Sequence, residues 1–306
     1  MSEDNKIEQP PLSKTIAAIF CAAFMWGSGN VIARSLLIEG VNQIFLVTSR
    51  IILVGSLYLI YYLLFVREGF DSKTFKEASI TGFVSVFTVG WCFIFALGHI
   101  SSGVVTLMVS SAPVFTIMWL KIFLKEEEIT RSRYASIFIG FLGIAYLFIT
   151  RETGLMAQGN IFLGGGLAFL GVQSIAIATV LNRKYAPSYK ISTWLCYQYV
   201  TIGALSLIAY FISGVEASPL DRSQQIRLAI LVLFNISAYL SFTWLIQRVP
   251  ALFAVIVDYI VPVVGVTAGV IFLNESFNLN IVIAAVFIFL SLYLSLIHIS
   301  EPTRPY

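Results

Sequence analysis

Two ionisable side chains, Arg50 and Asp258, interrupt long apolar runs well away from the ends of those runs. A charge inside a membrane-spanning helix is costly, so such residues generally mark a substrate or ion pathway. Arg50 should lie a turn or two into its helix from one membrane face, and Asp258 about two turns into its helix from the other. We expect the two to form a charge pair, structural or functional, or to bind the opposite charges of a zwitterionic substrate.

A polar patch in the first apolar run adds hydrogen-bonding groups without charge. It runs from Trp26 to Asn30 through Gly27, Ser28 and Gly29; its glycines expose backbone, and Asn30 offers both a donor and an acceptor. The aligned segment of the second half is also polar, and several aromatic side chains could line the same space. The candidate substrate-binding residues are Trp26, Asn30, Trp91, Gln173, Tyr239, Trp244, Asp258 and Tyr259.

Two prolines, Pro113 and Pro262, also lie inside apolar runs. A proline removes one backbone donor and frees a carbonyl one turn earlier, so both should kink their helices. We expect them to shape a cavity or act as hinges; simple accommodation of helix packing is the alternative.

Other kinds of chemistry find little support. Cys21, Cys92 and Cys196 all lie in apolar runs without CxxC spacing, which is typical of buried thiols rather than metal ligands. Ser28 lacks both a G-x-S-x-G context and a neighbouring histidine, so a serine nucleophile is not expected. We expect neither an enzyme nor a cofactor or metal site, and the net charge of +3 is too small to indicate a nucleic-acid surface.

The composition explains how these polar residues are positioned. The chain is 58% hydrophobic and 11% charged, against about 45–50% and about 25% in soluble domains. At about 20 residues per crossing, 306 residues accommodate ten spanning helices and no extramembrane domain. We predict an all-α integral membrane protein with helices at 12–34, 43–66, 76–98, 102–124, 133–150, 160–182, 191–213, 226–247, 251–273 and 280–298, after a disordered cytoplasmic tail at 1–11.

The placement of Lys and Arg predicts the orientation. Fourteen of the 19 lie in the tails and loops on the side of the termini, and four lie on the other side. Cytoplasmic loops carry the excess of positive charge, so both termini are expected in the cytoplasm.

The two halves of the sequence align at a constant offset of 149 residues. Pro113 falls on Pro262, Arg34 on Arg183, and the I-F-L-x-E run ending at Glu126 falls on the run ending at Glu275. We therefore expect two repeats, 12–150 and 160–298. Because five helices per copy is an odd number, the second copy must be inverted in the membrane, an architecture that recurs in secondary transporters.

Several motifs resemble the EamA-type repeat of the drug/metabolite transporter (DMT) superfamily. They are the run Ala96–Gly103, Ser111-Ala-Pro113, the segment 123–130 and the glycines Gly140 and Gly143; the second copy has Val249-Pro-Ala251, Val261-Pro262 and Leu273-Asn-Glu275. The resemblance covers about 13–297 and implies a ten-helix carrier with a central cavity, flanked by the last helix of each repeat. The second copy departs from the pattern, with Phe289 and Leu292 in place of the two glycines.

The resemblance also implies a function. We expect a secondary transporter that exports amino acids or their derivatives by alternating access, with possible proton coupling through Asp258; the alternative is an uptake carrier for a nucleotide-related or S-adenosylmethionine-like metabolite. The implied setting is the bacterial cytoplasmic (inner) membrane, with a small-molecule substrate and the lipid bilayer as partners and a monomer as a plausible state. The run Ser295–Tyr306 resembles a translated sequencing adapter, so we expect the tail at 299–306, with His298, to be non-native.

Overall fold

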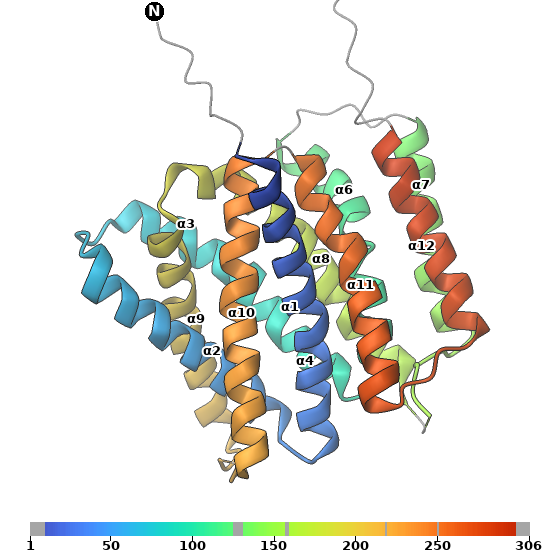
Figure 1. Ribbon diagram of the computed structural model, residues 1–306, viewed down its shortest axis with the longest axis horizontal. Helices are drawn as coiled ribbons and strands as arrows, with labels where there is room; N and C mark the ends of the chain where they lie inside the picture. Colours follow the sequence, from blue (N-terminus) through green and yellow to red (C-terminus); the bar gives the residue numbers. More distant parts are fainter. Residues whose placement is uncertain (1–9, 125–130, 157–158, 218, 250, 298–306) are drawn as a thin grey trace, which may run out of the picture.

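The computed structural model describes residues 10–124, 131–156, 159–217, 219–249 and 251–297, and within these ranges it contains helices and loops but no strand (Figure 1). Ten apolar segments run through the bundle. In chain order they are α1 (Leu12–Ile38); α2 (Gln43–Tyr61) with η1 (Tyr62–Val66); α3 (Ser72–Gly82) with η2 (Phe83–Thr88) and α4 (Val89–Leu97); α5 (Ser102–Val109) with α6 (Ala112–Leu124); α7 (Arg131–Ile149); α8 (Ile161–Tyr185) with η3 (Ala186–Ser188); α9 (Ile191–Ser213); α10 (Arg222–Arg248); α11 (Ala251–Leu273); and α12 (Leu279–Ile297).

Eight of these segments are long and apolar enough to cross a bilayer, and α7 and α12 supply two shorter apolar helices. The prediction of an all-α, ten-helix membrane protein is confirmed. The tails at 1–9 and 298–306 lie outside the described residues.

The 149-residue offset reappears in the helices themselves. It carries α1 onto α8, α2 onto α9, the α3–α4 segment onto α10, the α5–α6 segment onto α11, and α7 onto α12, within a few residues at each boundary. Helix α1 begins and α12 ends at the same end of the bundle, at the top of Figure 1. We call this the termini end. Each copy has five spanning segments, so corresponding helices of the two copies run in opposite directions.

The two copies are interleaved rather than side by side. Helix α1 packs mainly on α10 and α11 of the second copy, while its counterpart α8 packs on α4 and α6 of the first. A Cβ at Gly27 of α1 would lie 2.9 Å from the carbonyl oxygen of Val261 in α11, so the close approach of these helices depends on glycine. Neither copy is therefore a separate rigid half of the molecule.

Helices α7 and α12 pack chiefly on each other, at the edge of the bundle (Figure 1). Gly140 and Gly143, which have no glycine counterparts in the second copy, allow α7 to approach α12 closely. A Cβ at Gly140 would lie 2.9 Å from Ser291 Oγ, and one at Gly143 would lie 2.9 Å from Ile288. Since α7 supplies the small residues, α12 can carry larger ones, such as Phe289, in the corresponding positions.

Candidate functional site

A cavity of about 260 Å³ lies where the first four segments of each copy meet. It is lined by residues of α1, α2, η2, α4, α5 and α6 and of α8, α9, α10 and α11, whereas α7 and α12 contribute none of its lining. The cavity therefore lies inside the interleaved bundle, where polar side chains are shielded from lipid.

One wall of the cavity is built around Arg50 of α2. Its guanidinium passes close to α4, where a Cβ on Gly90 would lie 2.9 Å from Nη2, so the absence of a side chain at Gly90 makes room for it. The hydroxyl groups of Tyr199 and Tyr239 are its electrostatic neighbours. Among the described residues no carboxylate forms an ion pair with Arg50, although a buried cation ordinarily requires one. Its positive charge is thus available to a ligand.

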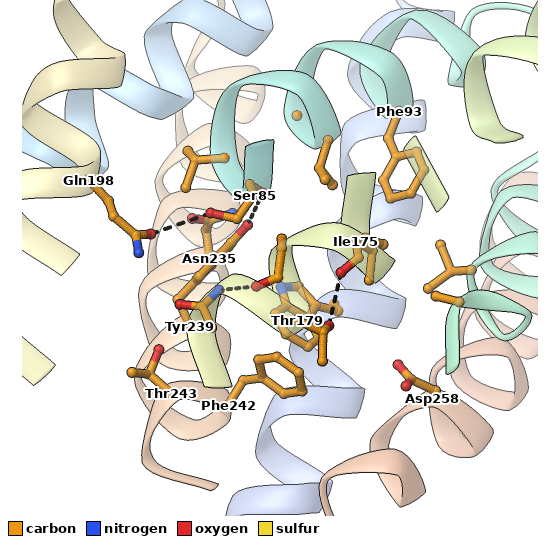
Figure 2. A pocket seen from close by; sticks show the side chains of 18 of the residues that line it. Ser85, Phe93, Ile175, Thr179, Gln198, Asn235, Tyr239, Phe242, Thr243 and Asp258 are labelled. Carbon is orange, nitrogen blue, oxygen red and sulfur yellow. Dashed lines mark hydrogen bonds between the residues drawn. The ribbon is translucent and has the colours of Figure 1, made fainter. Parts of the chain in front are cut away.

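Hydrogen bonds hold the polar neighbours of Arg50 in place (Figure 2). Tyr239 Oη donates to the Ser85 carbonyl at 2.9 Å, and Ser85 Oγ donates to Gln198 Oε1 at 3.4 Å. Tyr199 Oη donates to Asn235 Oδ1 at 2.5 Å. We call Arg50, Ser85, Gln198, Tyr199, Asn235 and Tyr239 together the arginine wall.

Aromatic rings extend the arginine wall. Trp26 of α1 packs edge-on against Tyr239 and Phe242, with ring centroids 5.6 Å and 4.9 Å apart. Tyr199 and Tyr239 meet edge to face at 5.7 Å. Such contacts fix the rings while leaving apolar surface available to a ligand.

Asp258 of α11 lines the cavity away from Ser85, Gln198 and Tyr239 (Figure 2). Its carboxylate has no hydrogen-bond partner among the described residues, and it lies in the electrostatic field of Arg183 at the end of α8. Its backbone carbonyl accepts a 2.8 Å hydrogen bond from Ser110 Oγ. The lining therefore holds Arg50 in one part and Asp258, with Arg183, in another.

The expected Arg50–Asp258 charge pair is not formed: in the described part of the chain no ion pair joins the two side chains. Arg50 interacts electrostatically with Tyr199 of α9 and Tyr239 of α10, whereas Asp258 interacts with Arg183. The physical reason is the interleaving of the copies, which places α2 against α9 and α11 against α1.

The other candidate residues divide into two groups. Trp26, Asn30, Tyr239 and Pro113 line the cavity with Arg50 and Asp258. Trp91, Gln173, Trp244, Tyr259 and Pro262 do not belong to the lining.

Four of the residues outside the lining have contacts of their own. Trp91 stacks on Phe95 at 5.9 Å, and Gln173 Oε1 accepts a 3.0 Å hydrogen bond from Trp119 Nε1. The Trp244 ring lies 5.6 Å from the Arg248 guanidinium. Tyr259 stacks on Phe289 of α12 at 6.3 Å.

The sequence interpretation missed the amides of the lining, Gln198, Asn235 and Asn182. It weighed only a few neutral polar groups inside the apolar runs, such as Asn30 and Gln173, and passed over these three amides. An amide far from the ends of a spanning helix is itself costly to bury without a partner, and that signal could have identified Gln198 and Asn235.

The cavity extends toward the termini end. There its lining includes Leu120, Arg183 and Thr243, close to the ends of α6, α8 and α10. On the opposite side most of the lining stops farther from the helix ends, at Asn30 in α1 and at Arg50 in α2. A ligand would thus meet less protein between the cavity and the termini end.

At the opposite end, a polar network that we call the distal lock joins the two copies. The Glu275 carboxylate accepts hydrogen bonds from the backbone N–H groups of Ser102 and Gly103, at 2.7 Å and 3.0 Å, and from Ser102 Oγ at 2.8 Å. A carboxylate is favoured at a helix N-terminus, so Glu275 caps α5 across the two copies. Its counterpart Glu126 lies outside the described residues.

Loop contacts complete the distal lock. Glu152 accepts hydrogen bonds from the Gly154 N–H at 2.9 Å and from Asn278 Nδ2 at 2.7 Å. The N–H of Ser276 donates to the carbonyl of Gly154 at 2.9 Å. These bonds join the loops of the two copies at the end away from the termini.

Comparison with known proteins identifies the fold. Residues 13–149 and 162–297 each match the EamA-like transporter family. The chain belongs to this family. An uncharacterized transporter of Archaeoglobus fulgidus is 27% identical over 197 residues, which cover 64% of this chain and 68% of that protein. A crystal structure of 16% sequence identity superposes with a TM-score of 0.67 over 95% of this chain and 99% of that one, a likeness of fold.

Family membership makes the chain a multi-pass membrane transporter of small molecules and not an enzyme. The lipid bilayer is its solvent, and the small molecule that it moves is its principal partner.

Proposed function

We propose that this EamA-like transporter is a secondary transporter that exports amino acids or closely related derivatives by alternating access. The observation that carries the proposal is the cavity with Arg50 and Asp258 in its lining and no ion pair between them. A zwitterion supplies an anion for the first and a cation for the second. Arg50 in particular has no carboxylate partner among the described residues, and an uncompensated charge in a spanning bundle is costly.

The inverted repeat supports the proposed alternating access. The distal lock closes one end of the molecule, while the cavity extends toward the termini end. Because the copies are related by inversion, an equivalent rearrangement would open the distal end and close the termini end at similar energy.

The direction rests on the charge count. With 14 lysines and arginines on the termini side and four on the other, we place both termini in the cytoplasm. The described state then opens toward the cytoplasm, as loading for export requires. We place the protein, functioning as a monomer, in the bacterial inner membrane.

Proton coupling through Asp258 completes the proposal. A carboxylate that lines a cavity without a hydrogen-bond partner could exchange a proton with whichever side the cavity faces. In proteoliposomes, substrate flux through Asp258→Asn should lose the pH dependence of the wild type. A variant that transports with the full wild-type pH dependence would end the coupling proposal.

A nucleotide-related or S-adenosylmethionine-like substrate taken up into the cell is the second candidate. The rings of Trp26, Tyr239 and Phe242 favour it, because a purine would stack on them. The cavity volume of about 260 Å³ favours the smaller amino acids, since pockets for drug-sized ligands run to about 300–1,000 Å³.

Counterflow separates the two candidates. Proteoliposomes loaded with unlabelled compound would receive tracer amounts of labelled amino acids in one series and of labelled adenosyl compounds in the other. We expect transient accumulation of an amino acid above its equilibrium level. Accumulation of adenosyl compounds alone would establish the second candidate in its place.

A further inference from the structure

In the arginine wall the amide acceptors have hydrogen-bond partners within the protein, whereas several donors do not. Gln198 Oε1 is occupied by the Ser85 hydroxyl, and Asn235 Oδ1 by the Tyr199 hydroxyl. The hydroxyl proton of Tyr239 is committed to the Ser85 carbonyl. Internal bonds therefore use the amide acceptors of this wall and the tyrosine protons.

The groups of this wall that are left without a hydrogen-bond partner among the described residues are donors. Gln198 is 1% exposed, and its Nε2 has no hydrogen-bond partner in the described structure. For Asn235 Nδ2 and the Arg50 guanidinium no hydrogen bond to a described residue is formed either. A buried amide donor without a partner is destabilising, so an acceptor that reaches it in the loaded state is expected.

A buried amide donor without a partner also occurs outside the cavity. Gln173 also has a buried Nε2 without a partner, but it lies outside the cavity and its Oε1 is bonded to Trp119. Gln198 differs from it because it lines the cavity beside Arg50, Tyr199 and Asn235. Unpaired donors from three helices, α2, α9 and α10, thus share one wall.

We propose that the arginine wall is a subsite for an anionic, acceptor-only group, a carboxylate, in which Gln198 and Asn235 act with Arg50 as specificity-determining residues. A carboxylate offers about four acceptor sites and no donor, which is the complement of this wall. Arg50 supplies the charge, and the two amides supply directed hydrogen bonds that distinguish a carboxylate from an amide or an ester. This assignment rests on the proposed function and names which end of the substrate faces which wall.

The test uses purified full-length protein, with thermal shift in detergent for binding and proteoliposomes for flux. The probes share one side chain: L-leucine, 4-methylpentanoate, leucinamide and isoamylamine, repeated with the corresponding alanine series. The first two carry a carboxylate, and the last two do not. The variants are Gln198→Met, which keeps the shape, and Asn235→Asp, which keeps the acceptor for Tyr199 but replaces the donor.

Ser206→Ala is the matched control. Ser206 lies on α9, as Gln198 does, and is also buried. Its Oγ has no hydrogen-bond partner in the described structure, but Ser206 does not line the cavity. We expect the wild type to prefer the two carboxylates, and Gln198→Met and Asn235→Asp to weaken their binding by about 10- to 100-fold. Ser206→Ala should bind like the wild type.

Several results would contradict the subsite. Wild-type preference for leucinamide or isoamylamine would overturn it while leaving transport intact. Equal weakening of all four probes in a variant that keeps the wild-type Tm would overturn the role of that residue. If Gln198→Met does not fold, Asn235→Asp and the wild-type probe preference still decide. Absence of any flux with either series would instead overturn the proposed function, and the subsite with it.

Discussion

The Ser110 hydroxyl donates a 2.8 Å hydrogen bond to the backbone carbonyl of Asp258. This carbonyl lies four residues before Pro262, so in α11 it has lost its helical donor. Ser110 belongs to the break between α5 and α6, which ends just before Pro113, the repeat counterpart of Pro262. The two proline sites of the inverted repeat thus meet, and one supplies the hydrogen bond that the other lacks.

Removing this bond should destabilise the protein in a way that depends on Pro262. Ser110→Ala leaves a buried carbonyl without a donor, at a cost of about 1–3 kcal/mol, and should lower the Tm. In a Pro262→Ala background the new N–H can bond to the Asp258 carbonyl, so the same substitution should cost less. A double-mutant cycle from denaturation in detergent measures the difference.

Ser111→Ala is the matched control for that cycle. Its hydroxyl bonds to the Met108 carbonyl, which also accepts from the Ser111 backbone N–H, so no carbonyl is left without a donor. Additive effects of Ser110→Ala and Pro262→Ala would show that the two sites are independent.

Gly90→Ala should impair transport without unfolding the protein. The new methyl group would meet the far end of the Arg50 side chain at 2.9 Å, and a flexible side chain can move away. Alanine also favours a helix over glycine by about 0.5–1 kcal/mol, so the Tm should hold or rise while substrate affinity falls several-fold. Gly203→Ala in α9, where a Cβ meets no atom within 4 Å, is the control. Unchanged affinity in Gly90→Ala would separate Arg50 from substrate binding.

Weakening the distal lock should expose the cavity to the side away from the termini. Glu275→Gln keeps one acceptor oxygen but loses the charge that favours the N-terminus of α5. With a single cysteine at Thr179, a position in the cavity lining, reaction with an impermeant maleimide from the distal side should speed up several-fold. Glu216→Gln, in an exposed loop, should leave the rate unchanged. Equal rates in both variants would remove Glu275 from the lock.

Acid should selectively weaken the contact between Glu68 and α9. Hydrogen bonds from Lys190 and Thr193 lower the pKa of Glu68 below its usual 4.5. A depressed folded-state pKa means that the stabilisation is present above pH 4.5 and is lost as the pH falls through the lower, folded value. The exposed ion pair contributes about 0.2–1 kcal/mol, so the Tm gap between wild type and Glu68→Gln should be small at pH 7 and vanish in acid. A difference in Tm between the wild type and Glu68→Gln that widens in acid would contradict this prediction.

The helices, the repeat and the inversion could be predicted from the sequence, because all three follow from the length of the apolar runs and the spacing of residues in them. The lining of the cavity could be predicted only in part. Which face of a helix is buried depends on the helices that it packs against. Helices α1 and α8 each pack on the other copy, and no local sequence pattern indicates this. Arg50 and Asp258 were identified as unusual, but of the two arrangements considered for them the direct charge pair is not formed between these described residues. Gln198 and Asn235 became informative only when their hydrogen bonds were known.

The π-helical segments η1 and η2 likewise could not be predicted from hydropathy. In η2 the widened turn precedes Gly90 and includes Ser85, so it helps to form the arginine wall. Such irregular turns arise from tertiary packing and frequently accompany functional sites.

Accessibility of one cavity position from both membrane sides tests alternating access most directly. The protein would carry Thr179→Cys in a background without Cys21, Cys92 and Cys196, in vesicles of defined orientation. We predict that an impermeant maleimide reacts from either side, faster from the termini side, while the vesicles stay tight to small ions. Reaction from one side only, or reaction accompanied by an ion leak, would contradict a carrier with an alternating cavity.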